Sequence, residues 1–142
     1  MKLISGNLKF FLCTYFNDIT SNFYTSDPKY LFSKVYKNYP NLKILLMHGG
    51  CERILEFAEL CRFSKNILLD LSLTLIKYQD SSIDNDINYL FKHFDQKITL
   101  GSDYPEVDYD HFINRIKYFS KNLPTNKKRN IYYLNFIKFI EK

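Results

Sequence analysis

Short apolar runs recur along this chain, each ending in small or polar residues and each followed by a stretch with helical periodicity. The runs and the residues after them are Lys43–Met47 before His48-Gly49-Gly50, Asn66–Leu71 before Ser72, and Lys97–Leu100 before Gly101-Ser102-Asp103. Repeated strand–loop–helix units with polar groups at the strand ends are how α/β barrels build their sites. The pattern therefore predicts an α/β fold with a site at the strand ends, and it places one histidine and one aspartate there.

The periodicity predicts four strands that alternate with helices, and one further helix at the end of the chain. The strands are expected at 8–14, 43–47, 66–71 and 97–100, and the helices from Pro28 to the Tyr39-Pro40 stop, then at 52–63, 83–93, 111–119 and 126–140. Strands that are rich in Ile and Leu and show little alternation are typical of a parallel sheet covered on both faces. Four such units make either a small open sheet or half of an eight-stranded barrel.

Length and charge limit the broad class of protein. At 142 residues the chain is long enough for a single domain, expected to span 1–142. The net charge of +5 comes from scattered lysines, with no basic stripe, so no nucleic-acid partner is expected. The apolar stretch Leu8–Leu12 is interrupted by Lys9 and is too short to cross a membrane. We expect no membrane partner and interpret this stretch as a buried strand.

The three cysteines predict a reduced, cytoplasmic protein. Cys13, Cys51 and Cys61 form no CxxC pair, and no secretory signal is visible. Cys51 and Cys61 fall in a predicted helix and are expected to pack in the core. The histidines outside the strand ends, His93 and His111, fall in helical stretches and are expected on the surface.

Three segments resemble, in their order and spacing, the last strands of the amidohydrolase-related metal-dependent hydrolases. Tyr39–Gly50 is similar to the segment that enters the sixth barrel strand, Asn66–Ser72 to the seventh strand, and Lys97–Pro105, with its Gly-Ser-Asp-Tyr-Pro sequence, to the eighth. Asn135 is similar to an asparagine common near that family's C-terminus. The resemblance implies that this chain is the C-terminal half of a (β/α)8 TIM-type barrel, with about four parallel strands, their helices and a terminal helix.

The resemblance also implies a metal site. In the family, a His-x-His pair after the first strand, a His after the fifth and an Asp after the eighth bind divalent metals, commonly zinc. Asp103 matches the aspartate that binds metal and accepts a proton from water, and His48 matches a sixth-strand histidine that binds metal or orients the reacting group. Where the family has His-Thr after the fifth strand, this chain has Cys13-Thr14, so Cys13 is a third candidate ligand. No His-x-His occurs in the chain.

The activity implied is hydrolysis of an amide, ester or lactone by metal-activated water, or decarboxylation of a small-molecule substrate. Gly49, Gly50 and Tyr104 are expected near the substrate, and Asp70 is expected to be structural or to support His48 through a hydrogen bond. Because ligands are missing, the chain alone is expected to be inactive. The missing groups would come from a separate N-terminal half or from a homodimer partner. Alternatively, the chain is a truncated, non-catalytic fragment or an assembly module that keeps the fold.

Overall fold

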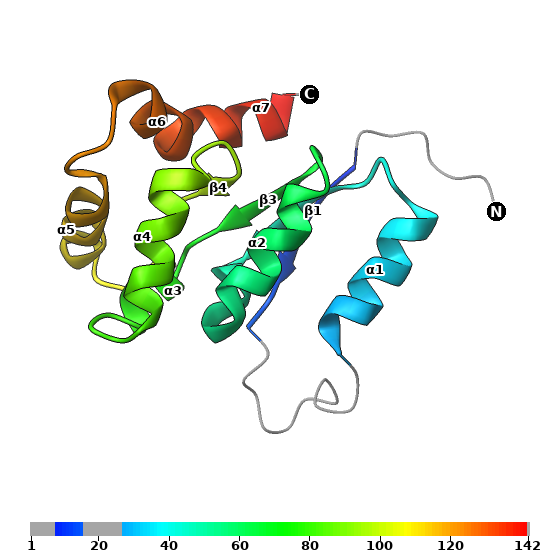
Figure 1. Ribbon diagram of the computed structural model, residues 1–142, viewed down its shortest axis with the longest axis horizontal. Helices are drawn as coiled ribbons and strands as arrows, with labels where there is room; N and C mark the ends of the chain where they lie inside the picture. The colour runs from blue at the N-terminus through cyan, green and yellow to red at the C-terminus, as the bar shows by residue number, and fades with distance from the viewer. Residues whose placement is uncertain (1–7, 16–26, 142) are drawn as a thin grey trace.

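Four parallel strands form the centre of the protein (Figure 1). The computed structural model describes residues 8–15 and 27–141, without the side chains of residues 28, 29 and 31; the remainder of the predicted 1–142 domain lies outside the described residues. The strands lie in the order β1 (Lys9–Cys13), β2 (Lys43–Met47), β3 (Ile67–Asp70) and β4 (Ile98–Thr99). Every pair of neighbours is parallel and consecutive in sequence, which confirms the predicted β–α repeat.

Helices follow each strand. Their bounds are α1 Pro28–Asn38, a 3₁₀ segment η2 His48–Arg53, α2 Ile54–Arg62, α3 Thr74–Lys77, α4 Ile83–His93, α5 Tyr109–Ser120, α6 Thr125–Arg129, a π segment η3 Asn130–Leu134 and α7 Asn135–Glu141. The predicted helix at 52–63 is preceded by η2 because Gly49, Gly50 and Cys51 all have positive φ. The predicted terminal helix is present, with a π turn in its middle. None of the described helices is both long and apolar enough to span a membrane.

The two faces of the sheet pack against different layers. Residues of one face join the main core with the apolar sides of α2 and α4; they include Ile44, Leu46, Ile67, Leu69 and Ile98. On the opposite face, Leu45 and Leu68 pack with Phe139 of α7. Each fully buried Leu or Ile contributes about 1.5–3 kcal/mol of transfer free energy. The face that packs against α2 and α4 holds the larger cluster of buried residues and therefore supplies most of the stability.

The terminal helix lies across the amino-terminal end of the sheet. Asn135 Nδ2 donates to the carbonyls of Asp95 (2.7 Å) and Ile98 (2.8 Å), at and before the start of β4. Lys43 Nζ, at the start of β2, donates to the carbonyl of Phe139 at 3.4 Å. These bonds close one end of the sheet and leave the carboxyl-terminal strand ends open.

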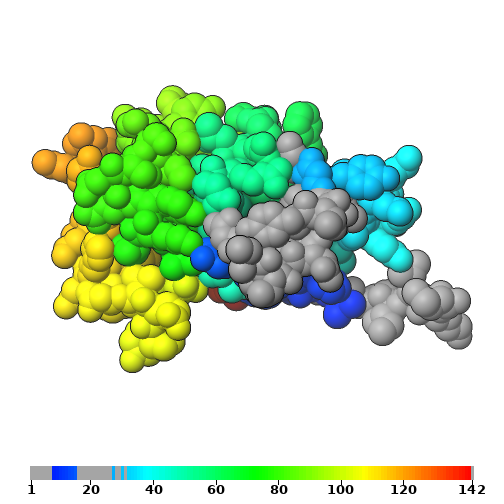
Figure 2. Space-filling model, turned by 90° about the horizontal axis from the view of Figure 1, so that it is seen from below, coloured from blue at the N-terminus to red at the C-terminus, as the bar shows by residue number. Residues whose placement is uncertain are grey.

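The first strand is exposed, and the prediction that it is buried is wrong. Phe10, Phe11 and Leu12 are 46%, 53% and 42% exposed. The physical reason is that β1 has only one neighbour, β2, and its other edge is unpaired among the described strands. Figure 2 shows α1 (cyan) and the yellow segment leading into α5 at opposite ends of the molecule. Among the described strands β1 and β4 are the two edges and do not pair with each other, so the described sheet is open.

Candidate active site

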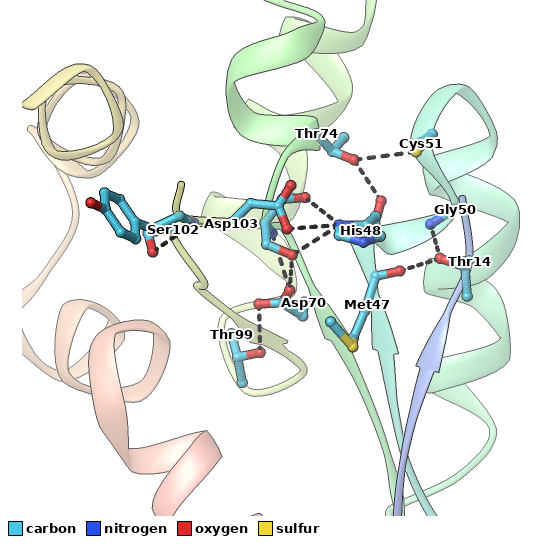
Figure 3. Close-up of polar contacts among 12 residues, drawn as sticks. Thr14, Met47, His48, Gly50, Cys51, Asp70, Thr74, Thr99, Ser102 and Asp103 are labelled. Atoms are coloured by element: carbon cyan, nitrogen blue, oxygen red, sulfur yellow. Dashed lines mark hydrogen bonds and ion pairs between the residues drawn. The ribbon is translucent and has the colours of Figure 1, made fainter. Parts of the chain in front are cut away.

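Polar side chains from three neighbouring strand ends meet at the carboxyl-terminal edge of the sheet (Figure 3). His48 directly follows β2, Asp70 is the last residue of β3, and Asp103 lies in the loop after β4. His48 is 8% exposed, and its Nδ1 lies 3.9 Å from Asp103 Oδ1. The structure thus brings together the two residues that the sequence singled out.

Ser72 connects His48 to a buried carboxylate. Its hydroxyl lies 3.1 Å from His48 Nδ1 and donates to Asp70 Oδ2, which also accepts the Ser72 N–H at 3.2 Å. Because the Ser72 hydroxyl proton is used on Asp70, the oxygen offers only lone pairs to His48. The Ser72 carbonyl, 3.4 Å from the same nitrogen, is also an acceptor. These contacts place the proton of neutral His48 on Nδ1 and leave Nε2 unprotonated.

Asp70 is the buried anchor of this network. Burial raises its pKa, while the hydroxyl and N–H of Ser72, the nearby His48 and the Thr99 hydroxyl act in the opposite direction. Thr99 Oγ1 donates to Asp70 Oδ1 at 3.4 Å, which ties β4 to β3. Asp70 therefore ties the ends of β3 and β4 together, in line with the structural role expected for it, and it is linked to His48 through Ser72.

The backbone at this edge is strained at the candidate residues themselves. His48 has φ 63° and Asp103 has φ 59°, in the left-handed region that costs an ordinary residue about 1–2 kcal/mol. Such outliers persist where surrounding contacts hold them, and they cluster at functional sites. Here the Thr74 hydroxyl donates to the His48 carbonyl and so holds the strained turn.

Thr14 fixes the same turn from the other side. Its hydroxyl donates to the Met47 carbonyl and accepts the Gly50 N–H at 2.7 Å. Thr14, Ser72 and Thr74 were not predicted as site residues. Ser72 could have been identified from the sequence, because it directly follows a predicted strand. No sequence periodicity distinguishes Thr14 and Thr74.

The other predicted site residues occupy different surroundings. Cys13 pairs with Met47 in the sheet register and is exposed. Gly49 lies against Asp70 and Leu71, and Gly50 against the ring of Phe57. Tyr104 is exposed beside Asp103. The remaining histidines, His93 in α4 and His111 in α5, are exposed, as predicted.

The family resemblance implies a divalent metal. The side chains available at the site show whether they could bind one. Imidazole and carboxylate are suitable ligands, but catalytic zinc normally has three from the protein. Among residues 8–15 and 27–141, no group of three His, Cys, Asp or Glu side chains is placed to hold a metal ion. His48 and Asp103 make two, and Cys13 does not complete a group with them. The described residues on their own therefore do not fit a catalytic metal.

A pocket of about 340 Å³ opens beside the polar cluster. It is lined by Phe11, Leu45, Met47, Asp70, Ser72, Thr99, Leu100, Gly101, Ser102, Asp103, Tyr104 and Phe136. Asp103 and Ser72 thus contact both this space and His48, which stands behind them. The Asp103 carboxylate is therefore one of the polar groups that a ligand in the pocket could contact.

The three thiols should differ sharply in reactivity. Cys13 is exposed, whereas burial raises the pKa of Cys51 and raises that of Cys61 to about 12. Because the thiolate is the reactive form, a chromogenic disulfide reagent should label one thiol per folded chain and three after denaturation. Cys13→Ser should remove the label from the folded protein. Labelling of two or three thiols without denaturation would contradict the packing of α2 and η2.

Comparisons with known proteins bear on the fold. No family model matches the chain, and no curated protein matches it. A crystal structure described as an uncharacterized TIM-barrel protein from Bordetella bronchiseptica is 16% identical, with a TM-score of 0.73 over 94% of this chain and 46% of that chain. This chain therefore spans about half the length of the barrel that it matches.

The fold is thus half of a TIM-type barrel: four parallel strands that alternate with helices. The polar cluster lies at the carboxyl-terminal face, where such barrels carry their active sites. That the chain is the C-terminal half remains a prediction from the resemblance.

Proposed function

We propose that this chain is one half of a hydrolase of the amidohydrolase type, which cleaves an amide, ester or lactone with an activated water molecule. The observation that carries the proposal is the convergence of His48 and Asp103, 3.9 Å apart, at the active-site edge of a half-barrel. The Ser72–Asp70 network that fixes the His48 ring supports it, because functional histidines are commonly oriented by a hydrogen-bond partner on one ring nitrogen.

The two residues have different parts in this proposal. Asp103 lines the pocket, so its carboxylate is the group that accepts a proton from water held there. His48 Nδ1 contacts the Ser72 hydroxyl at 3.1 Å and lies 3.9 Å from the Asp103 carboxylate, and in this proposal the imidazole helps to position Asp103. The strained φ of both residues keeps the two groups facing each other before substrate arrives.

The remaining groups of the site come, in this proposal, from a second half-barrel, either an N-terminal half or another copy of this chain. The edge of β1 that has no partner among the described strands, with its exposed apolar side chains, favours such an assembly. A divalent metal bound by ligands from both halves would lower the pKa of its water to about 7. No step assigned here to His48 or Asp103 depends on that metal.

The test combines mass, metal content and turnover on one sample. Light scattering and elemental analysis are applied to the size-exclusion peak, which is then assayed with chromogenic esters, anilides and lactones with and without added Zn²⁺. We expect turnover in an assembled, metal-containing species. Asp103→Asn should lower the rate at least about 100-fold, the contribution typical of a general base.

Asp110→Asn is the matched control, because Asp110 is an exposed carboxylate in α5 and should leave the rate unchanged. An Asp103→Asn variant that stays folded and keeps the wild-type rate would contradict the proposal.

A second candidate function is a non-catalytic assembly module. The observation in its favour is that no three His, Cys, Asp or Glu side chains among the described residues are grouped so that they could hold a metal ion. A folded, assembled wild-type chain that holds no metal and hydrolyses none of the panel would favour this function over the hydrolase.

A further inference from the structure

The pocket beside Asp103 has a charge pattern that restricts its ligands. Among the described residues twelve line the pocket; two of them, Asp70 and Asp103, carry carboxyl groups, and none of the twelve is Lys, Arg or His. The chain as a whole has a net charge of +5, so this lack of cations is local to the pocket. An anionic ligand would lose hydration and find no opposite charge, which is costly in a partly apolar space.

The far side of the pocket is apolar. Phe11 and Phe136 meet edge to face with ring centroids 6.4 Å apart, and Leu45, Met47 and Leu100 continue the surface. Aromatic side chains provide large contact areas and favour ring-containing partners. The volume of about 340 Å³ is at the small end for ligand sites, which suits a body of one or two rings.

One hydroxyl at the polar end is placed to recognise a carbonyl. The Ser72 and Thr99 hydroxyls both donate to Asp70. Ser102 Oγ instead accepts the N–H of Tyr104 at 3.3 Å, which leaves its own proton for a ligand. Ser102 and Asp103 both line the pocket, so a carbonyl held by this hydroxyl would share that space with the carboxylate.

We propose that this pocket binds a small neutral molecule with an aromatic or aliphatic body and an amide or ester carbonyl. The body lies against Phe11 and Phe136, and the carbonyl faces Ser102 and Asp103. This inference names the substrate class of the proposed hydrolase. The part of it that concerns hydrolysis of the bound molecule rests on that proposed function. Binding itself requires neither metal nor turnover and can be measured alone.

The experiment compares two fluorescent probes that differ by one charge, N-(2-naphthyl)acetamide and 6-acetamido-2-naphthoate. Each is titrated with the full chain in metal-free buffer, and its Kd is determined from the fluorescence change. We expect the neutral amide to bind at least about fivefold more tightly, the ratio for one like charge at close range in a water-like dielectric. Asp103→Asn should reduce that ratio, mainly by improving binding of the anion.

Phe136→Ala should weaken binding of the neutral amide by about threefold or more, because it removes one wall of the apolar surface. Phe136 is 37% exposed, and circular dichroism would verify that the variant folds. Tyr104→Ala gives a second test at an exposed lining residue and should also weaken binding. Phe63→Ala is the control, because Phe63 is 86% exposed and lies outside the pocket.

Equal or tighter binding of the naphthoate would overturn the inference, as would amide binding that neither Phe136→Ala nor Tyr104→Ala changes. The two proposals fail separately. Probe binding as expected, with no hydrolysis by the assembled protein, contradicts the hydrolase alone. Hydrolysis that depends on Asp103 but prefers anionic substrates contradicts this inference alone.

Discussion

Gly50→Ala is expected to lower the free energy of unfolding by about 3 kcal/mol or more. A Cβ at this position would lie 2.1 Å from Cδ2 of Phe57, whose ring is 1% exposed and cannot move aside without disturbing the core. Gly50 also has φ +78°, where a side chain is strained. Left-handed strain of about 1–2 kcal/mol and overpacking of about 1–3 kcal/mol add at this site. Urea denaturation followed by circular dichroism measures the loss.

Gly49→Ala is the matched control for Gly50→Ala. Gly49 has a similar φ of +59°, but its nearest neighbours, the Asp70 carbonyl and the Leu71 side chain, lie 3.3 and 3.4 Å from the added Cβ. We expect a loss of about 1–2 kcal/mol, mostly from the backbone conformation. Equal losses for the two variants would show that the contact with Phe57 is not what requires glycine at 50.

Asn135→Asp is expected to destabilise the protein by about 3 kcal/mol at neutral pH. The Asn135 side chain is 6% exposed, and its Nδ2 donates to the carbonyls of Asp95 and Ile98. A carboxylate of the same shape cannot donate, so two buried carbonyls lose their partner and face a negative charge. The terminal helix would then lose its attachment to β4. Chemical denaturation and the heat stability of the helical signal measure the effect.

The pH dependence of Asn135→Asp distinguishes this cause from a general packing defect. Burial beside two carbonyls should raise the pKa of the introduced carboxyl in the folded state above that in the unfolded state. The unfolded state then holds fewer protons between these two pKa values, so stability falls as pH rises through that range. The deficit should therefore shrink on acidification. Asn126→Asp, at an exposed position of α6, should change stability by less than about 0.5 kcal/mol.

Much of the architecture could be predicted from local patterns. The helices at 83–93 and 111–119 and the strand 43–47 were located within a few residues, because apolar periodicity reports directly which side of an element is buried. The parallel arrangement followed from the lack of alternation in the Ile- and Leu-rich runs. The exposure of β1 could not be predicted, because an edge strand and a central strand can have the same composition.

Part of the candidate site could also be predicted from local sequence patterns. His48 and Asp103 were placed at strand ends, and parallel strands bring their carboxyl ends to one edge of a sheet. The relay through Ser72 and the carbonyl contact of Thr74 depend on turns with positive φ at His48 and Leu73. Single-residue conformations of this kind leave no periodic trace in a sequence.

By itself, the sequence determined the repeated strand–loop–helix order, the burial of the central strands and the presence of one histidine and one aspartate at strand ends. These follow from local apolar patterns and short-range turn chemistry. Only the tertiary structure decided that Asp70 reaches His48 through Ser72 and that Cys13 faces outward from an open edge. It also decided that the residues seen to line the pocket beside Asp103, within 8–15 and 27–141, include no cation. Those features depend on which side chains of distant segments come within a few ångströms of one another, and that is set by packing across the whole sheet.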